Sequence, residues 1–86
     1  DPFLQHALAL EYIKGGDDMR AKNLFEEILE RDPGYVGSYY HLGKLLERIN
    51  EPDSAMEIYA TGMKECKKVN DKHAYNELQS ALEELT

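Results

Sequence analysis

The stretch LALEYIKGGDDMRAKNLF at residues 8–25 is followed 34 positions later by LGKLLERINEPDSAMEIY at residues 42–59. The two stretches keep the same residue character at matching places. The matched pairs are Leu8 with Leu42, Ala9 with Gly43, Gly16 with Asn50, Ala21 with Ala55, and Phe25 with Tyr59. Such a repeat indicates pairs of helices that stack, because one pair alone is too small to bury its apolar side. The small residues predict where the helices cross closely.

Residues that stop or start helices divide the chain at regular intervals. Gly and Asn tolerate a left-handed helix end, Asp caps a helix start, and Pro is accepted in a first turn but not further on. The breaks lie at Gly15-Gly16-Asp17-Asp18, Asp32-Pro33-Gly34 and Asn50-Glu51-Pro52, with a softer one at Lys68-Val69-Asn70-Asp71. Between the breaks, apolar residues recur every three or four positions, and no stretch alternates with the period of a strand. The sequence therefore predicts an all-α protein of five helices.

This pattern resembles the tetratricopeptide repeat, which has a 34-residue period and an aromatic–x2–Leu–Gly–x2–Tyr, Ala–x3–Phe, Pro signature. The second unit, about 36–69, matches at Tyr39, Leu42, Gly43, Ala55 and Tyr59. The first unit, about 2–35, matches at Leu8, Ala9, Tyr12, Ala21, Phe25 and Pro33. Gln5, Leu46 and Lys67 depart from the signature, at the places of the leading aromatic, the Tyr and the Pro. The resemblance implies an α-solenoid of two antiparallel helix–turn–helix repeats.

The remaining residues, about 70–85, are enough for one helix but not for a third pair. Their best register puts Tyr75 and Leu78 at the first two signature positions and Gln79 at the small-residue position. A long polar side chain there suits a helix with no neighbour stacked on that side. We therefore expect a C-terminal capping helix, which repeat arrays need to stay soluble.

Composition excludes several classes of function. The chain has 86 residues, with 10 Lys and Arg against 17 Asp and Glu, for a net charge of −7. Nucleic acids and anionic membranes are bound through basic surfaces, so neither is an expected partner. No apolar run is long enough to cross a membrane, and no signal peptide is recognisable. The single Cys66 cannot form an internal disulfide, so we expect a cytoplasmic protein.

The resemblance also implies a function, because the first helix of each pair in this family lines a concave groove for a peptide or partner helix. Carried over by position, the expected groove residues are His6, Leu10, Tyr40, His41, Lys44, Arg48 and Asn76. Some members clamp the C-terminal carboxylates of heat-shock chaperones with Lys and Asn. Here His6, Leu10 and His41 stand at the first three clamp positions, so a chaperone clamp is not expected. In a competing interpretation, Leu10 only completes the packing of the first helix, and Lys44 and Arg48 only form ion pairs with nearby acids.

A structural spacer or self-association unit is the alternative function. Glu26, Glu27, Glu30 and Asp32 crowd one helix, and Lys64, Lys67, Lys68 and Lys72 gather near the end of repeat two. These opposite charges would suit a weak homo-oligomer, although most such charges are only solvated helix faces.

The sequence predicts no cofactor, metal ion or catalytic site. The three histidines fall on the three helices that are expected to line the groove, at His6, His41 and His73. No two of them have the spacing of three or four residues that helical metal sites favour. No nucleophile with a partner base is recognisable, and Gly15-Gly16 simply ends a helix. We therefore expect a binding module that is not an enzyme.

Overall fold

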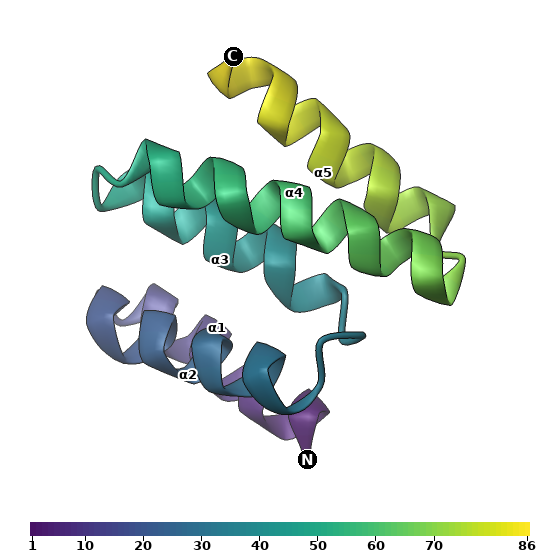
Figure 1. The fold of residues 1–86 in the computed structure, drawn as a ribbon. Helices are drawn as coiled ribbons and strands as arrows, with labels where there is room; N and C mark the ends of the chain where they lie inside the picture. Colours follow the sequence, from purple (N-terminus) through teal and green to yellow (C-terminus); the bar gives the residue numbers. More distant parts are fainter.

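The computed structural model describes residues 1–86 and consists of five α-helices without a strand (Figure 1). The helices are α1 (Pro2–Lys14), α2 (Asp18–Arg31), α3 (Gly37–Arg48), α4 (Pro52–Val69) and α5 (Lys72–Leu85). Each predicted break contains the junction between two helices, so the all-α prediction with five helices is confirmed. Asn70, which we had expected at the start of the capping helix, instead ends α4.

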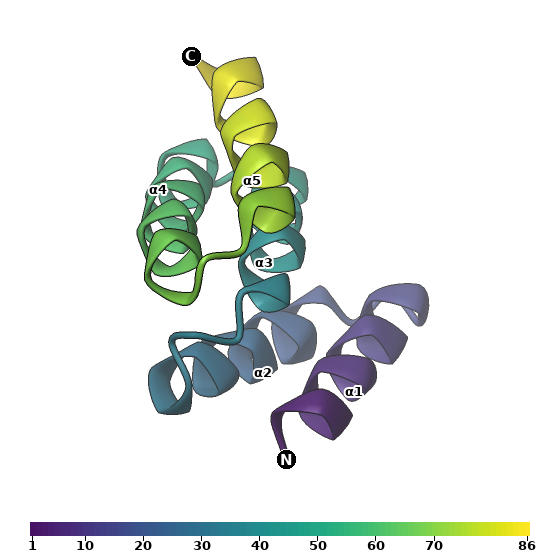
Figure 2. The same cartoon turned by 90° about the vertical axis from the view of Figure 1, so that its right-hand side faces the viewer.

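The helices form two hairpins and a cap. α1 packs against α2, α3 packs against α4, and α5 lies against α4 and α3 (Figures 1 and 2). The first hairpin meets the second through α2 and α3. This is the expected α-solenoid of two antiparallel repeats with a C-terminal capping helix. The repeat boundaries near residues 35 and 69 stay a prediction.

Three of the four turns end the preceding helix in the same way. Gly16, Asn50 and Asn70 have φ angles of 81°, 66° and 60°, in the left-handed region. At each turn the next residue's N–H donates to a carbonyl five positions back, at 2.8, 2.8 and 2.9 Å. This pair of features is the Schellman motif, which satisfies carbonyls that a helix end would leave free. Pairing Gly16 with Asn50 in the sequence thus identified a shared turn geometry.

Aspartates begin three of the helices. The side chains of Asp1, Asp17 and Asp71 accept hydrogen bonds from the N–H groups of Phe3, Arg20 and Ala74, at 3.0, 3.2 and 3.0 Å. Each carboxylate accepts a hydrogen bond from an N–H group that the first turn leaves unpaired. Its negative charge also interacts favourably with the positive end of the helix dipole.

Small residues lie at the closest crossings. Ala9, Ala21 and Ala55 are completely buried. A Cβ added to Gly43 would lie 2.1 Å from Cε1 of Tyr59, so the bare backbone of α3 makes room for that ring on α4. Any larger residue at this position would push the second hairpin apart.

A second close approach involves a residue that the repeat comparison did not single out. A Cβ on Gly62 would lie 2.7 Å from Cβ of Tyr39 on α3 and 2.8 Å from Cδ1 of Leu78 on α5. Gly62 on α4 therefore lets both neighbouring helices come close. Its match in the first repeat is Ile28, a large residue, so the comparison gave no signal there.

Polar contacts also fix the second hairpin. The hydroxyl of Tyr39 donates to the carbonyl of Pro33 at 2.7 Å, tying α3 to the loop before it. The hydroxyl of Tyr59 on α4 donates to the carboxylate of Glu47 on α3, which joins these two helices. Burial raises the pKa of Tyr39 to about 12, with smaller contributions from nearby acids, and raises the pKa of Tyr59 as well. Both hydroxyls therefore stay protonated donors at any physiological pH.

Candidate functional site

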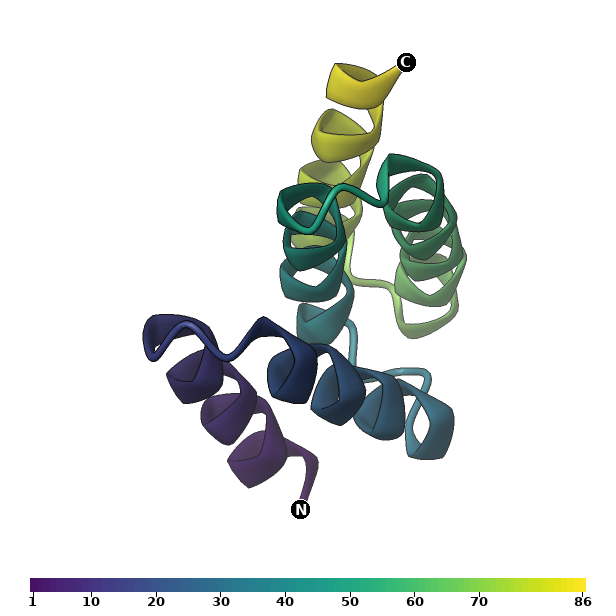
Figure 3. The same ribbon diagram turned by 90° about the vertical axis from the view of Figure 1, so that its left-hand side faces the viewer.

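One side of the molecule is formed by α1, α3 and α5, and the opposite side by α2 and α4 (Figures 2 and 3). Four of the seven predicted groove residues, His6, Tyr40, His41 and Lys44, make contacts with one another on α1 and α3. We call these four residues the α1–α3 cluster. The contacts that hold the cluster define what it offers to a partner.

His6 lies at the centre of these contacts. Its ring centroid is 5.3 Å from that of His41, and the two rings meet edge to face. Its Nδ1 is 2.8 Å from Oγ of Ser38, which is completely buried. Two further rings surround it, because Phe25 and Tyr35 each lie 5.6 Å away. His6 therefore joins α1 to α3 across the junction between the hairpins.

His41 links the same junction to the surface. Its ring is parallel to that of Phe25, with 6.3 Å between the centroids, and it meets the Tyr40 ring edge to face at 5.8 Å. Burial lowers the pKa of both His6 and His41 below the ordinary 6.5. His41 lowers the pKa of His6 further, whereas Glu77 partly opposes the lowering of the His41 pKa. Both rings are therefore neutral at pH 7.

Lys44 gives the cluster a positive charge beside an aromatic ring. Its Nζ lies 5.6 Å from the Tyr40 ring centroid, within the range of a cation–π contact. The same Nζ is 3.8 Å from the carboxylate of Glu47. Lys44 thus has the acidic partner that the competing interpretation expected, and its side chain still keeps 39% of its surface exposed.

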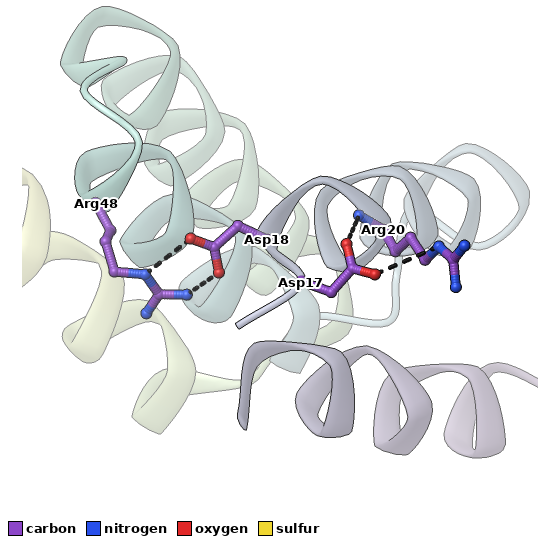
Figure 4. A network of polar contacts seen from close by, with 4 residues as sticks. All are labelled: Asp17, Asp18, Arg20 and Arg48. Atoms are coloured by element: carbon purple, nitrogen blue, oxygen red, sulfur yellow. Dashed lines mark hydrogen bonds and ion pairs between the residues drawn. The ribbon is translucent and has the colours of Figure 1, made fainter. Parts of the chain in front are cut away.

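Arg48 has a structural partner that the sequence did not indicate. Its guanidinium makes two contacts with the carboxylate of Asp18 on α2, at 2.5 and 3.3 Å (Figure 4). Asp17 beside it pairs instead with Arg20 on its own helix, at 3.3 Å (Figure 4). The hydrogen bond from Arg48 lowers the pKa of Asp18, and the same bond raises the pKa of Arg48. The guanidinium therefore ties the two hairpins together, which leaves it less free to bind a partner.

Leu10 and Asn76 lie outside the α1–α3 cluster. Leu10 is half-buried and packs against the core, as the competing interpretation expected. Asn76 is exposed and lines a cleft of about 300 Å³ at the turn between α4 and α5, with Lys67, Lys72 and Tyr75. The predicted groove residues thus divide into a contacting group of four and three that lie apart from it.

Ser38, Phe25 and Tyr35 hold the cluster, and the sequence reasoning assigned them no such role. Ser38 is paired by the 34-residue shift with Leu4, an exposed apolar residue, so the repeat gave no hint of its hydrogen bond. Phe25 was recognised as a signature aromatic, but its contacts with His6 and His41 depend on how the hairpins stack. No feature of the linear sequence reports that stacking.

The remaining reactive side chains do not converge. Cys66 is 1% exposed, and burial together with nearby Asp71 raises the pKa of its thiol. His73 lies 3.8 Å from Glu77 on its own helix. No group of three or more His, Cys, Asp or Glu side chains is placed to hold a metal ion. None of the five helices has the length and apolarity needed to cross a membrane.

Comparisons with known proteins agree on one family. The family model described as tetratricopeptide repeat matches residues 16–82. A tetratricopeptide repeat domain protein from Salinibacter ruber, solved as a crystal structure, is 45% identical with a TM-score of 0.93, covering 99% of this chain and 94% of that one. A solution NMR structure of a tetratricopeptide repeat domain protein from Salinibacter ruber is also 45% identical, with a TM-score of 0.96 and coverage of 99% and 86%.

A more distant structure shares the fold alone. It is the solution structure of a protein from Bordetella parapertussis, 24% identical with a TM-score of 0.86, covering 99% of this chain and 74% of that chain. The search of curated proteins found no match.

Proposed function

This chain belongs to the tetratricopeptide repeat family, and we propose that its α1–α3–α5 side binds a segment of a partner protein. The fold of this family generally mediates protein–protein interaction. Its members are generally scaffolds rather than enzymes. The finer proposal concerns which side chains make the contact and what kind of segment they fit.

The observation that supports the proposal most is the convergence of the α1–α3 cluster. The rings of His6 on α1 and His41 on α3 lie 5.3 Å apart, the Tyr40 ring on α3 lies 5.8 Å from His41, and a lysine lies over the Tyr40 ring. The His6–Ser38 hydrogen bond and the buried Phe25 ring fix these side chains in place before any partner arrives. Preorganised side chains lose little conformational entropy on binding, which favours affinity.

The chemistry of the cluster suits a segment with an apolar or aromatic anchor and a nearby carboxylate. Tyr40 and the two neutral imidazoles offer ring faces and hydrogen-bonding nitrogens, and Lys44 offers a positive charge. We propose Leu10 at the edge of this contact, and Arg48 and Asn76 at its periphery. Two repeats provide a short surface, so we expect a dissociation constant of about 1 µM or weaker.

Other partners suit this chain less. The net charge of −7 opposes binding to nucleic acid. We also propose no catalytic role for His6, His41 or Cys66, because each one is explained by packing or by a hydrogen bond in the core.

A random peptide library displayed on phage tests the proposal. Peptides selected on the domain are synthesised, and their affinity is measured by isothermal titration calorimetry for the native chain and for a Tyr40→Ala/Lys44→Ala variant. Because this variant removes both the ring and the charge, we expect affinity to fall at least about tenfold, which corresponds to 1.4 kcal/mol.

A matched control lies on the opposite side of the molecule. Glu57→Ala/Thr61→Ala changes two exposed residues of α4, and it should leave the affinity unchanged. Circular dichroism establishes that both variants remain helical. Full affinity in the folded Tyr40→Ala/Lys44→Ala variant would refute the proposed site, and so would a library that yields no binder.

A further inference from the structure

The two ends of the molecule differ in form, since one exposes an apolar ridge and the other carries a groove. At the N-terminal end, α1 exposes Phe3, Leu4 and Leu8, which keep 65%, 64% and 47% of their surface accessible. We call these three residues the α1 ridge. Leu4 and Leu8 are four positions apart and therefore lie one above the other on the helix. Such a ridge is the form in which a helix docks into an apolar groove of another protein.

The C-terminal end carries a groove between α4 and α5. It consists of two adjoining clefts of about 300 and 220 Å³, which share Lys67 and Tyr75 as lining residues. Ala60, Met63 and Leu82 give the smaller cleft an apolar floor. We call the two clefts together the α4–α5 groove. In Figure 1, α1 lies at one end of the molecule and α5 at the other, so one molecule cannot bring its own ridge to its own groove.

The charges beside the two surfaces are predominantly opposite in sign. Lys64, Lys67 and Lys72 line the groove together with one acid, Asp71, and no carboxylate lies within 4.0 Å of any of the three amino groups. Next to the ridge, Glu27 lines a cleft of about 230 Å³ together with Leu8, and the one cation of that cleft, Arg20, is paired with Asp17.

The helix that packs against α1, α2, carries two further exposed acids. Glu26 and Glu30 are exposed on α2, and they too lack a cation within ion-pair distance, although Lys22 and Arg31 of the same helix offset part of their charge. Unpaired charges of opposite sign at two complementary surfaces favour contact between those surfaces over other orientations.

From these observations we propose that a second copy of this chain inserts its α1 ridge into the α4–α5 groove. The contact is head to tail, because the two surfaces differ and lie at opposite ends. A contact of this kind leaves one free ridge and one free groove on each dimer, so it builds longer chains or rings rather than closed dimers. It uses neither the α1–α3 cluster nor a peptide partner, and so it does not rest on the proposed function.

The first test is the mass of the native chain in solution. We expect sedimentation equilibrium in about 0.1 M salt to show a mass that rises with concentration, from 9.9 kDa to more than twice that value at about 1 mM. At this ionic strength the Debye length is about 10 Å, which screens the overall repulsion between acidic molecules but not adjacent ion pairs. A constant mass of 9.9 kDa up to about 1 mM would overturn the proposal.

Two variants distinguish a head-to-tail contact from a symmetric one. Leu4→Glu/Leu8→Glu disables the ridge and leaves the groove intact, whereas Lys64→Glu/Lys67→Glu disables the groove and leaves the ridge intact. All four residues are exposed, so both variants should keep the helical circular dichroism of the native chain. Each variant alone should stay monomeric.

An equimolar mixture of the two variants should form a dimer and nothing larger, because each supplies the surface that the other lacks. Val69→Glu is the matched control, since it places the same charge at an apolar residue of 50% exposure outside both surfaces, and it should associate like the native chain. If the groove variant still self-associates, or if the mixture stays monomeric, the contact is not ridge into groove and the proposal fails.

Discussion

The two hairpins share one plan but differ in how firmly their first helices are held. α3 buries six residues, among them Tyr39, Leu42 and Gly43, whereas α1 buries only Ala9. The difference follows from position, since α3 packs against α2, α4 and α5, whereas α1 packs extensively only against α2 and reaches α3 mainly through His6. Repetition in sequence therefore does not mean equal stability, because each helix depends on what its neighbours cover.

Overpacking the helix crossing tests this difference with the largest expected effect. Gly43→Leu forces a side chain into the Tyr59 ring, whose Cε1 would lie 2.1 Å from the new Cβ. We expect the free energy of unfolding to fall by about 3 kcal/mol or more, since α3 is packed on both sides and cannot move away. Urea denaturation followed by circular dichroism measures the loss.

The matched change in the first hairpin is Ala9→Leu, at the completely buried position that the repeat pairs with Gly43. We expect a smaller loss of about 1 kcal/mol, because α1 can shift outward. Gly37→Ala is the control, because a Cβ there meets nothing within 4 Å. Equal losses for Ala9→Leu and Gly43→Leu would break the comparison.

The hairpin turns are where the two repeats should behave alike. Gly16 and Asn50 occupy the same left-handed place, with φ angles of 81° and 66°. Gly16→Ala places a Cβ in a conformation that costs about 1 kcal/mol, and Asn50→Ala removes the short polar side chain that helps an L-residue adopt the same conformation, so both should destabilise the fold. Asn50→Gly should instead raise the melting temperature slightly, because glycine accepts this φ without strain.

Thermal melts of the three turn variants measure these effects. An Asn50→Ala variant as stable as the native chain would show that the left-handed turn does not constrain the second hairpin. A cost confined to one hairpin would show that the shared turn geometry does not carry a shared energy.

Lowering the pH should reduce folding stability through the two histidines at the junction of the hairpins, and this is the smallest of the expected effects. The folded pKa values of His6 and His41 lie below the ordinary 6.5, so the fold favours neutral rings. The stability that this provides is fully present above pH 6.5 and is lost as the pH falls below 6.5 toward the folded values. Melting temperatures from about pH 8 to about pH 5 measure the loss.

A His6→Gln/His41→Gln variant should lose less stability than the native chain over the same range. His73→Gln is the control, because the His73 side chain is 89% exposed and should not contribute. The burial of the two rings would be contradicted if lowering the pH past 6.5 destabilised the native chain no more than it destabilised the His6→Gln/His41→Gln variant.

Much of the fold could be predicted because it depends on local sequence signals. Helix-ending Gly and Asn, capping Asp and the 34-residue shift each depend only on residues close in sequence or equivalent by repeat. Gly62 was missed although a glycine inside a helix costs about 1 kcal/mol relative to alanine, which itself indicates a packing role. Its role appears only when α5 is placed beside α3.

The candidate site was less predictable for a related reason. The sequence placed His6, Tyr40, His41 and Lys44 on one side of the molecule, and the structure brings them together. The bonds that fix or divert the site residues span 30 to 32 positions, as in His6 with Ser38 and Arg48 with Asp18. Such pairs depend on how the hairpins are rotated against each other, which no periodicity encodes.

Gly62 also makes the packing of α5 depend on the second hairpin. Its Cα faces Tyr39 and Leu78, so the floor on which α5 rests exists only once α3 and α4 have met. A helix of 14 residues is marginal on its own in water. Any change that separates α3 from α4 therefore also removes the support of α5, so the C-terminal helix should lose its structure together with the second hairpin rather than independently of it.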